Sequence, residues 1–123
     1  MSFYDEIGGE STIAAIARGF YARVAADPVL LPLYPERDLA PAQRRLELFL
    51  TQYWGGPTTY SEERGHPRLR MRHMPYVITP EVRDHWLSCM LGAIDGAELD
   101  TQHHADFVDY VTRAADAMIN ARG

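Results

Sequence analysis

Residues 52 to 76 read QYWGGPTTYSEERGHPRLRMRHMPY, and this stretch decides most of the fold. Its glycine pair and the following proline, Gly55 to Pro57, end the helical pattern before them, because glycine and proline interrupt regular helices. A loop is expected from there to His66-Pro67, where a short helix can begin, and Pro75 ends that helix. The short helix concentrates three arginines and one histidine in the sequence RLRMRH, residues 68 to 73.

Helical geometry divides RLRMRH into two faces. Arg68 and Arg72 are four residues apart, so they share one face of the helix. Leu69 and His73 share a different face, and Tyr76 extends it. A solvated helix face would explain the arginines, but it does not explain a histidine in the apolar stripe.

The whole chain is acidic, which argues against a nucleic-acid patch at these arginines. It contains 17 aspartate and glutamate residues against 12 arginines, and its formal net charge is −5. General nucleic-acid binding depends on neutralising many phosphates, so we expect no nucleic-acid partner. The chain has no lysine, which excludes Schiff-base chemistry on a lysine side chain.

A metal-hydrolase site is a second interpretation, built on Asp84-His85 and on His103, His104 and Asp106. Histidine and aspartate are ordinary ligands of divalent metals. Adjacent residues on a helix diverge by about 100°, however, so His103 and His104 cannot both point at one ion. We therefore favour a solvated start of the last helix for these residues.

A haem ligand is the third interpretation, and it uses His73. Imidazole binds haem iron through one nitrogen while the other donates to a carbonyl, here that of Leu69 or Arg70 one turn earlier. The two propionates of haem need cations at the edge of the pocket, and the neighbouring arginines would supply them. A single histidine on an apolar face is also compatible with ordinary core packing, and the residues alone leave both interpretations open.

Helical spacing of apolar residues continues along the rest of the chain, with no convincing alternating strand. Pro28, Pro32 and Pro35 limit the segment between the first two long helices to short turns. Four long helices are expected. The first ends near Asp27-Pro28, and the second runs from about Pro41 to Gly55-Gly56. The third begins at Thr79-Pro80, and the fourth begins near Asp100. The expected fold class is all-α.

Length and composition predict one domain, residues 1–123, located in the cytoplasm. Apolar residues make up 46% of the chain, which is typical of globular proteins. The single cysteine, Cys89, cannot form an internal disulfide, so a reducing compartment is expected. The acidic N-terminus lacks the pattern of a signal peptide, and no stretch approaches the roughly 18 apolar residues of a membrane span.

Four motifs of this sequence resemble those of the bacterial truncated haemoglobins. They are FYDEIGGE at Phe3 to Glu10, FY at Phe20-Tyr21, YP at Tyr34-Pro35, and the stretch from Gln52 to Tyr76, which is similar to group II of that family. Trp86 follows His73 by thirteen residues, as the pocket tryptophan of that group does. The resemblance implies a truncated globin fold with two antiparallel helix pairs, two over two, around a haem. One pair would carry Tyr21 and Phe49, and the other Trp86 and Val108.

The resemblance also implies a set of site residues and haem b as the cofactor. His73 would be the iron ligand, and Ala42 would stand where many globins have a distal histidine. Arg45, Tyr60 and Arg72 would bind the propionates. The implied haem-contacting residues are Arg45, Leu46, Phe49, Tyr60, Arg72, His73 and Trp86. The implied gas-facing residues are Tyr21, Tyr34, Ala42 and Trp86.

The function implied by the resemblance is tight binding of dioxygen and of other small ligands such as NO, CO or peroxide. Bound dioxygen carries partial negative charge, so phenol and indole donors aimed at it slow its release. Such a pocket is unsuited to oxygen transport and suits NO or peroxide detoxification, with nitric oxide dioxygenase or peroxidase-like activity. The chain has no flavin or nicotinamide motif, so a separate reductase would supply electrons. The alternative is a non-enzymatic gas sensor or oxygen-binding interaction module, and a homo-oligomer is compatible with either function.

Overall fold

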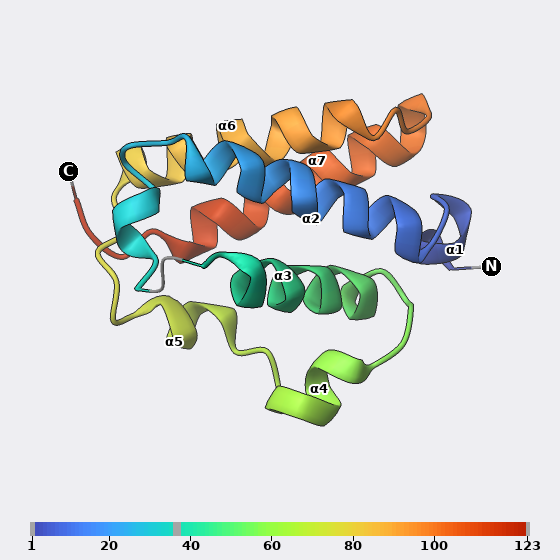
Figure 1. Cartoon of the computed structure of the whole chain (residues 1–123), viewed down its shortest axis with the longest axis horizontal. Helices are drawn as coiled ribbons and strands as arrows, with labels where there is room; N and C mark the ends of the chain where they lie inside the picture. Colours follow the sequence, from blue (N-terminus) through green and yellow to red (C-terminus); the bar gives the residue numbers. More distant parts are fainter. Residues whose placement is uncertain (1, 36–37, 123) are drawn as a thin grey trace.

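A computed structural model describes residues 2–35 and 38–122, and all regular structure in those residues is helical (Figure 1). The prediction of an all-α fold is therefore confirmed. The elements in chain order are α1 (Phe3–Glu6), α2 (Glu10–Ala25), the 3-10 helix η1 (Leu31–Leu33), α3 (Ala40–Tyr53), α4 (Thr59–Arg64), α5 (Leu69–His73), α6 (Pro80–Gly96) and α7 (Thr101–Met118).

Two of the long helices begin at the predicted caps. The Thr79 hydroxyl accepts a hydrogen bond from the backbone N–H of Val82 at 3.2 Å and caps α6. The Asp100 carboxylate accepts from the backbone N–H of His103 at 2.9 Å and caps α7. Such caps satisfy backbone donors that have no partner inside the helix, and each stabilises its helix by about 1 kcal/mol.

The segment between Pro57 and His66, expected to be a loop, contains the helix α4. This helix is short and polar, so no apolar periodicity marks it in the sequence. Its main support comes from α3: the Gln52 side chain donates to the Ser61 hydroxyl at 2.7 Å and accepts from the Ser61 backbone N–H at 2.9 Å. The prediction was wrong because this support is a tertiary contact rather than a local pattern.

The helix α5 begins at Leu69, one residue after Arg68. Arg68 has a left-handed backbone, with φ of 44°, and therefore stands outside the helix as its N-cap. The expected helical face shared by Arg68 and Arg72 is accordingly not formed. Tyr76 likewise lies beyond the end of α5.

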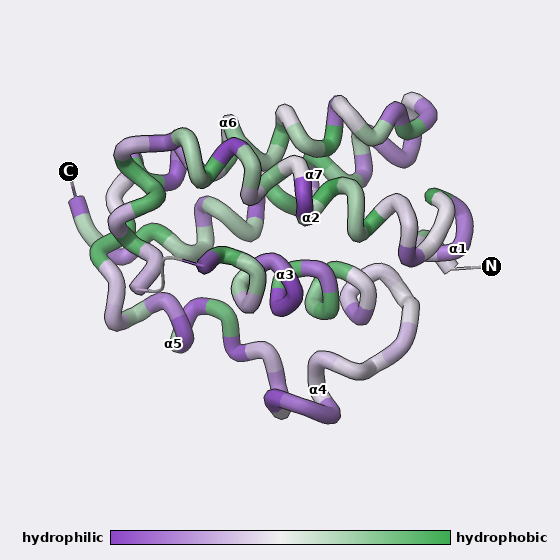
Figure 2. Tube along the Cα trace, viewed as in Figure 1, coloured by the Kyte–Doolittle hydropathy of each residue, from purple (hydrophilic) through white to green (hydrophobic). Residues whose placement is uncertain are grey.

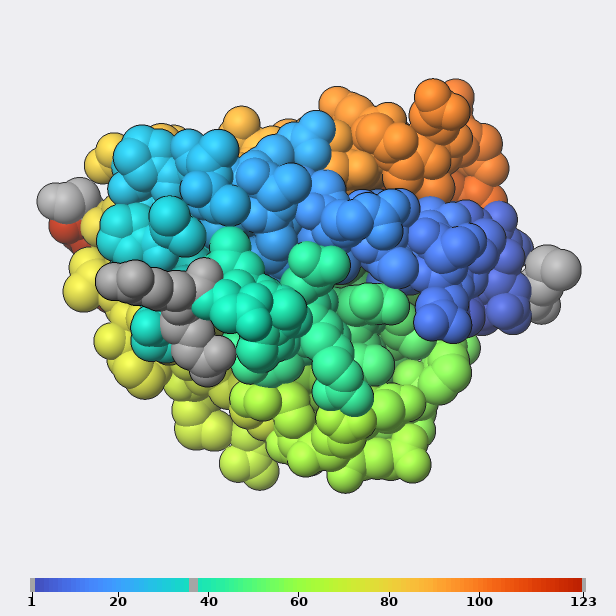
Figure 3. All heavy atoms as spheres, in the orientation of Figure 1, coloured from blue at the N-terminus to red at the C-terminus, as the bar shows by residue number. Residues whose placement is uncertain are grey.

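The long helices form two antiparallel pairs, α2 with α3 and α6 with α7, which confirms the two-over-two arrangement (Figure 1). The pairs join where α2 crosses α6, and a Cβ atom added at Gly19 would lie 3.5 Å from the Cβ of Ala93. Figure 3 shows the side chains of α2 and α3 packed against each other on one face of the molecule. The largest fully buried side chains are Phe20, Phe107, Ile13, Ile16, Leu30, Leu50, Met90, Ile94, Val24 and Val111.

The helices α4 and α5 lie outside these two pairs. Figure 1 shows them on a connection that leaves the end of α3 and returns along the lower edge of the molecule. Mostly hydrophilic residues occupy α4 (Figure 2). Among the long helices of the described residues, α5 packs mainly against α7. None of the helices in the described residues is long and apolar enough to cross a membrane.

Candidate functional site

A cavity of about 380 Å³ lies between the two helix pairs and α5. Its volume falls in the usual range for small-molecule and cofactor sites, roughly 300–1,000 Å³. Every long helix contributes to its wall. The residues that the family resemblance implied as haem-contacting or gas-facing all line this cavity: Tyr21, Tyr34, Ala42, Arg45, Leu46, Phe49, Tyr60, Arg72, His73 and Trp86.

His73 stands at the C-terminal end of α5, and one ring nitrogen is held by the backbone of its own helix. Its Nδ1 lies 2.7 Å from the carbonyl oxygen of Leu69, one of the two acceptors expected from the sequence. A carbonyl can only accept, so Nδ1 carries the proton of this hydrogen bond. The neutral ring then has its lone pair on Nε2, which is the nitrogen suited to bind a metal.

One side chain and one backbone hydrogen bond connect α5 and the residues that follow it to the C-terminal segment. Arg70 donates from Nη1 to the carbonyls of Ala117 and Ile119, at the end of α7. The backbone N–H of Asn120 donates to the carbonyl of Ile78 at 2.9 Å. Because α5 is only five residues long, such contacts rather than its own hydrogen bonds must fix its position.

The Asn120 side chain makes three hydrogen bonds to the backbone between His73 and Ile78. Its Oδ1 accepts from the N–H of Ile78 at 2.9 Å, and its Nδ2 donates to the carbonyls of Tyr76 at 2.9 Å and His73 at 3.3 Å. Asn120 thus closes the turn that carries the chain out of the histidine helix. The sequence gives no signal of this role, because the two segments are more than forty residues apart.

Arg72 holds the loop between α4 and α5. Its Nε donates to the carbonyl of Pro67 at 2.7 Å, and Nη2 donates to the carbonyl of Arg64 at 2.8 Å. The guanidinium carbon lies 6.0 Å from the centre of the Tyr60 ring, within the range of a cation–π contact. Arg72 therefore has a structural role, and Nη1 is the part of its guanidinium outside these backbone bonds.

Three aromatic side chains with N–H or O–H groups gather from other elements at the cavity wall. Tyr21 comes from α2, Tyr34 follows η1, and Trp86 comes from α6. The rings of Tyr21 and Tyr34 meet edge to face with centres 5.7 Å apart. The ring centres of Trp86 and Phe20 are 5.3 Å apart. These contacts limit the ring orientations.

Both tyrosines keep their protons at neutral pH. Burial raises the pKa of Tyr21, while a hydrogen-bonding interaction with Tyr34 acts in the opposite direction. Burial, followed by the neighbouring Tyr21, raises the pKa of Tyr34 well above its ordinary value. Each phenol therefore carries one O–H group, which can donate to the other tyrosine or to a ligand in the cavity.

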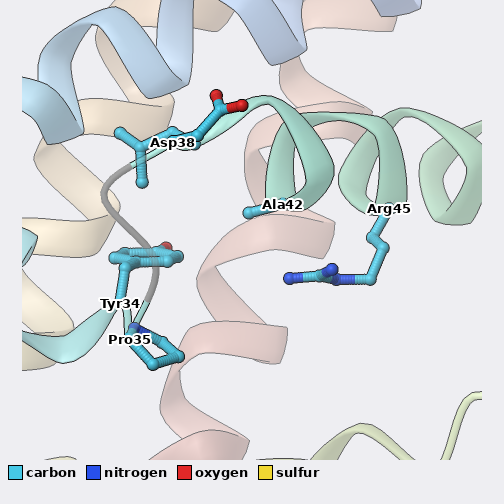
Figure 4. Close-up of a pocket in the computed structure, with 6 residues that line it drawn as sticks. Tyr34, Pro35, Asp38, Ala42 and Arg45 are labelled. Atoms are coloured by element: carbon cyan, nitrogen blue, oxygen red, sulfur yellow. The ribbon is translucent and has the colours of Figure 1, made fainter.

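The helix α3 supplies a mixed wall of apolar and charged groups. Ala42 is buried, and Leu46 and Phe49 follow it on the same helical stripe. Figure 4 shows Ala42 and Arg45 projecting from α3 on the side that faces Tyr34. A side hollow of about 20 Å³ opens between Tyr34, Ala42 and Arg45, which is enough room for one water molecule.

The cavity fits a haem group. Its wall combines a histidine whose Nε2 carries a lone pair, the apolar side chains of Leu46 and Phe49, and the cationic side chains of Arg45 and Arg72. Haem requires an axial ligand, an apolar enclosure for the ring and partners for two propionates. The cavity provides each of these chemical types.

The histidines of the metal-hydrolase interpretation point to separate acidic partners. His103 lies 2.6 Å from Asp100 and 3.1 Å from Glu6, whereas His104 lies 2.7 Å from Asp95. No group of three potential ligands suited to a metal ion is found within residues 2–35 and 38–122. The divergence expected for two adjacent helical histidines is therefore observed.

His85 contacts the turn after α2 instead of a metal. Its Nδ1 lies 2.9 Å from Oδ2 of Asp27, whose Oδ1 also accepts from the backbone N–H groups of Val29 and Leu30 at 2.9 Å. This contact joins α6, next to Trp86, to the segment that leads into η1. The carboxylate raises the pKa of His85, and the imidazole in turn lowers the pKa of Asp27.

Comparisons with known proteins show which family and which solved structures the chain is similar to. A family model described as bacterial-like globin matches residues 2–120. The group 2 truncated haemoglobin YjbI of Bacillus subtilis is 43% identical over 117 residues, which cover 95% of this chain and 87% of the relative. A thermostable haemoglobin from the actinobacterium Thermobifida fusca is 57% identical, with a TM-score of 0.97 and 98% of each chain covered. A truncated oxygen-avid haemoglobin from Bacillus subtilis is 42% identical, with a TM-score of 0.92, covering 98% of this chain and 100% of the other.

The His85–Asp27 contact predicts a pH-dependent stability. The pKa of His85 is raised above its ordinary value of 6.5. The contribution of His85 to the free energy of unfolding is therefore complete below pH 6.5 and disappears as the pH rises through the folded-state pKa. The pKa of Asp27 is lowered below 3.8, so the contribution of Asp27 to the free energy of unfolding is present above pH 3.8 and is lost as the pH falls through the folded-state pKa. His85→Gln should therefore lower the free energy of unfolding most between pH 3.8 and pH 6.5, as measured by urea titration.

His66→Gln is the matched control, because His66 is exposed. Its stability difference from the unmodified protein should be small throughout the same range. The groups that act on His85 besides Asp27 are Glu81, at 4.0 Å, and Asp84. A loss of stability in His85→Gln that is the same at pH 5 and at pH 9, roughly 1.5 units below and 2.5 above the ordinary histidine value, would contradict the assignment.

Asn120→Ala should loosen the turn that follows His73. Removing the side chain leaves the N–H of Ile78 and the carbonyl of Tyr76 without their partners, at a local cost of about 1 kcal/mol. Amide hydrogen exchange of Ile78 should accelerate, while exchange in α2 stays unchanged. Asn120→Asp keeps the acceptor for Ile78 and should largely preserve its protection. Equal protection of Ile78 in Asn120→Ala and the unmodified protein would show that Asn120 does not hold this turn.

Proposed function

The chain belongs to the bacterial-like globin family, as a group II truncated haemoglobin, and from this we propose that it binds dioxygen tightly on haem b and acts in the detoxification of nitric oxide or peroxide. Family membership implies haem-based binding of small gas ligands. The observation that carries the finer proposal is the group of three donors, Tyr21, Tyr34 and Trp86, on the wall of the cavity that also contains His73.

In this proposal His73 binds the iron through Nε2. The hydrogen bond from Nδ1 to the Leu69 carbonyl orients the ring and increases its basicity. Arg45, Tyr60 and Arg72 bind the propionates, with Arg72 acting through the part of its guanidinium that the loop carbonyls leave available. When bound, haem supplies an iron centre that coordinates a diatomic ligand and exchanges electrons.

The donors stabilise a ligand that carries partial negative charge. Tyr21 and Tyr34 remain protonated, and the indole N–H of Trp86 is always a donor. Each such bond contributes roughly 1–3 kcal/mol in a pocket that excludes water. Ala42 adds no hydrogen bond, so retention of the ligand depends on the aromatic donors. The oxygen-avid relative from Bacillus subtilis supports the same conclusion.

Tight retention of dioxygen favours reaction over transport. A ligand held by several donors leaves slowly, which gives a second reactant such as nitric oxide time to enter. Electrons for repeated turnover would come from a separate reductase. We also propose that residues 1–123 act as one globin domain in the cytoplasm, which the match of the family model to residues 2–120 and the single cysteine, Cys89, support.

Trp86→Phe should release dioxygen faster than the unmodified protein. The substitution keeps an aromatic ring beside Phe20 and removes the indole N–H. Loss of one hydrogen bond of about 1–3 kcal/mol corresponds to a rate increase of about 5-fold to 150-fold. Stopped-flow mixing of the oxygenated protein with an oxygen scavenger measures this rate.

Trp54→Phe is the matched control, because Trp54 is the other tryptophan and does not line the cavity. Its Nε1 is buried and has no hydrogen-bond partner among residues 2–35 and 38–122, so the substitution removes no such bond there. Oxygen release should stay at the unmodified rate in this variant. If Trp86→Phe also released oxygen at the unmodified rate, Trp86 would not be one of the donors.

Nitric oxide consumption tests the reaction itself. The oxygenated protein mixed with nitric oxide should convert it to nitrate in a single rapid turnover, and further turnover should require an added reductant. Tyr34→Phe is expected to weaken oxygen binding and reduce the nitrate yield at low oxygen. Absence of nitrate from the fully oxygenated protein would contradict the detoxification of nitric oxide.

A further inference from the structure

An apolar patch lies exposed on the outer face of α5 and on the residues that follow it. Met71 and Met74 are 56% and 57% exposed, and Val77 is 64% exposed. The two methionines are three residues apart and therefore share one face of the helical turn. Leu69 and His73 line the cavity, whereas these three residues do not. The helix that presents His73 to the cavity thus presents an apolar surface, here called the outer α5 patch, to the solvent.

The composition of the outer α5 patch is typical of a binding surface. Six large hydrophobic side chains of the described residues are exposed, and four of them lie between residues 71 and 77. Exposed apolar groups that gather in one place mark interaction sites, whereas scattered ones do not. Methionine is flexible and polarisable, and methionine and arginine are both enriched in the cores of protein–protein interfaces. The patch therefore has the properties of a protein-docking site.

Positive charge accompanies the patch. Residues 64–77 contain four arginines and no aspartate or glutamate. Arg68 immediately precedes α5 and Arg70 lies on it, and both are exposed. Neither forms an ion pair with an acidic side chain within residues 2–35 and 38–122. Their charges are therefore available to an acidic partner.

Acidic residues concentrate at the opposite end of the molecule. Residues 95–109 contain five acidic residues and no arginine, and they include the connection between α6 and α7. Figure 1 shows this connection far from α5. Such an asymmetric charge distribution orients an approaching acidic protein toward α5. Charges more than about 8 Å away are largely screened at physiological ionic strength, so the local arginines outweigh the net charge at contact.

The outer α5 patch is separated from the cavity by the thickness of one helix. A helix with its side chains is about 10–12 Å across. The rate of electron transfer between proteins falls steeply with distance, so a donor on this face would be close to an iron centre bound by His73. The position of the patch therefore suits the delivery of electrons.

We propose that the outer α5 patch, together with Arg68 and Arg70, is the docking surface of an acidic protein that carries a one-electron donor such as a reduced flavin. The inference rests on the proposed haem binding and on the proposed separate reductase. In each encounter the donor loses one electron and ferric iron gains it and becomes ferrous, while no covalent bond forms or breaks. Electron-transfer partners meet over small interfaces, below about 1,200 Å², which agrees with a patch of this size.

A second copy of the chain and an anionic membrane fit this surface less well. In a two-fold dimer the patch would face itself, so Arg68 and Arg70 of one copy would meet the same two arginines of the other. A flat membrane would also approach Glu62 and Glu81, which are exposed on either side of residues 64–77 in the sequence. A protein partner can contact the patch without these carboxylates.

The binding test uses haem-loaded protein with ¹³C-labelled methionine methyl groups, in the diamagnetic ferrous carbonmonoxy form. Addition of a purified acidic flavodoxin should shift the NMR signals of Met71 and Met74. The signal of Met90, which is fully buried, should stay in place. The shifts should disappear in 1 M salt, where the Debye length is about 3 Å.

Arg68→Glu should weaken flavodoxin binding and slow the reduction of the ferric protein by reduced flavodoxin, each by roughly 3-fold to 30-fold, because it replaces an attraction with a repulsion. Met71→Gln should weaken binding through the loss of apolar contact. Arg18→Glu is the matched control, because Arg18 is exposed on α2, does not line the cavity and undergoes the same change of charge. Dithionite, a small reductant that needs no docking surface, should reduce all of these proteins at similar rates.

Equal losses in Arg68→Glu and Arg18→Glu would overturn the inference, because only net charge would then matter. Shifts of Met71 and Met74 that require a higher concentration of the protein itself, or vesicles of phosphatidylglycerol, in place of flavodoxin would also overturn it. A Soret band recorded in the same samples separates the two hypotheses. Its absence would mean that the haem proposal has failed, whereas a normal band without methionine shifts would refute the docking surface alone.

Discussion

The hydrogen bond between Nδ1 of His73 and the carbonyl of Leu69, at 2.7 Å, is the interaction on which the rest of the site depends. It fixes which nitrogen carries the proton and leaves the lone pair of Nε2 for a metal. The bond exists only while α5 is helical and in place. A helix of five residues is too short to be stable by itself. The structure therefore has to hold α5 from outside.

Arginine and asparagine side chains provide that external support by binding backbone carbonyls. Arg70 reaches the end of α7, Arg72 holds the loop before α5, and Asn120 closes the turn after it. Two of the three arginines of RLRMRH, Arg70 and Arg72, thus bind backbone carbonyls of the protein itself. On the other side of the cavity, the contact between His85 and Asp27 joins the elements that carry Trp86 and Tyr34. The side of the cavity formed by α5 and the side that carries Trp86 and Tyr34 are therefore held by separate sets of contacts.

The parts of the fold that depend on local pattern could be predicted from the sequence. The caps at Thr79 and Asp100 define where α6 and α7 begin, because a capping side chain acts on its own helix. The pairing of the helices, and the site residues as a set, followed from resemblance to a family. The helix α4 and the roles of Arg70 and Asn120 could not be predicted, because their partners are distant in the chain.

The central claim, that Nε2 of His73 binds haem iron, is tested most directly by the visible spectrum of ferrous, haem-loaded His73→Gly. The account predicts a spectrum that differs from that of the unmodified protein and returns to it when imidazole is added, because free imidazole fills the space of the missing ring. His66→Gln, which alters an exposed histidine, should retain the unmodified spectrum. An unchanged ferrous spectrum of His73→Gly without imidazole would contradict the account.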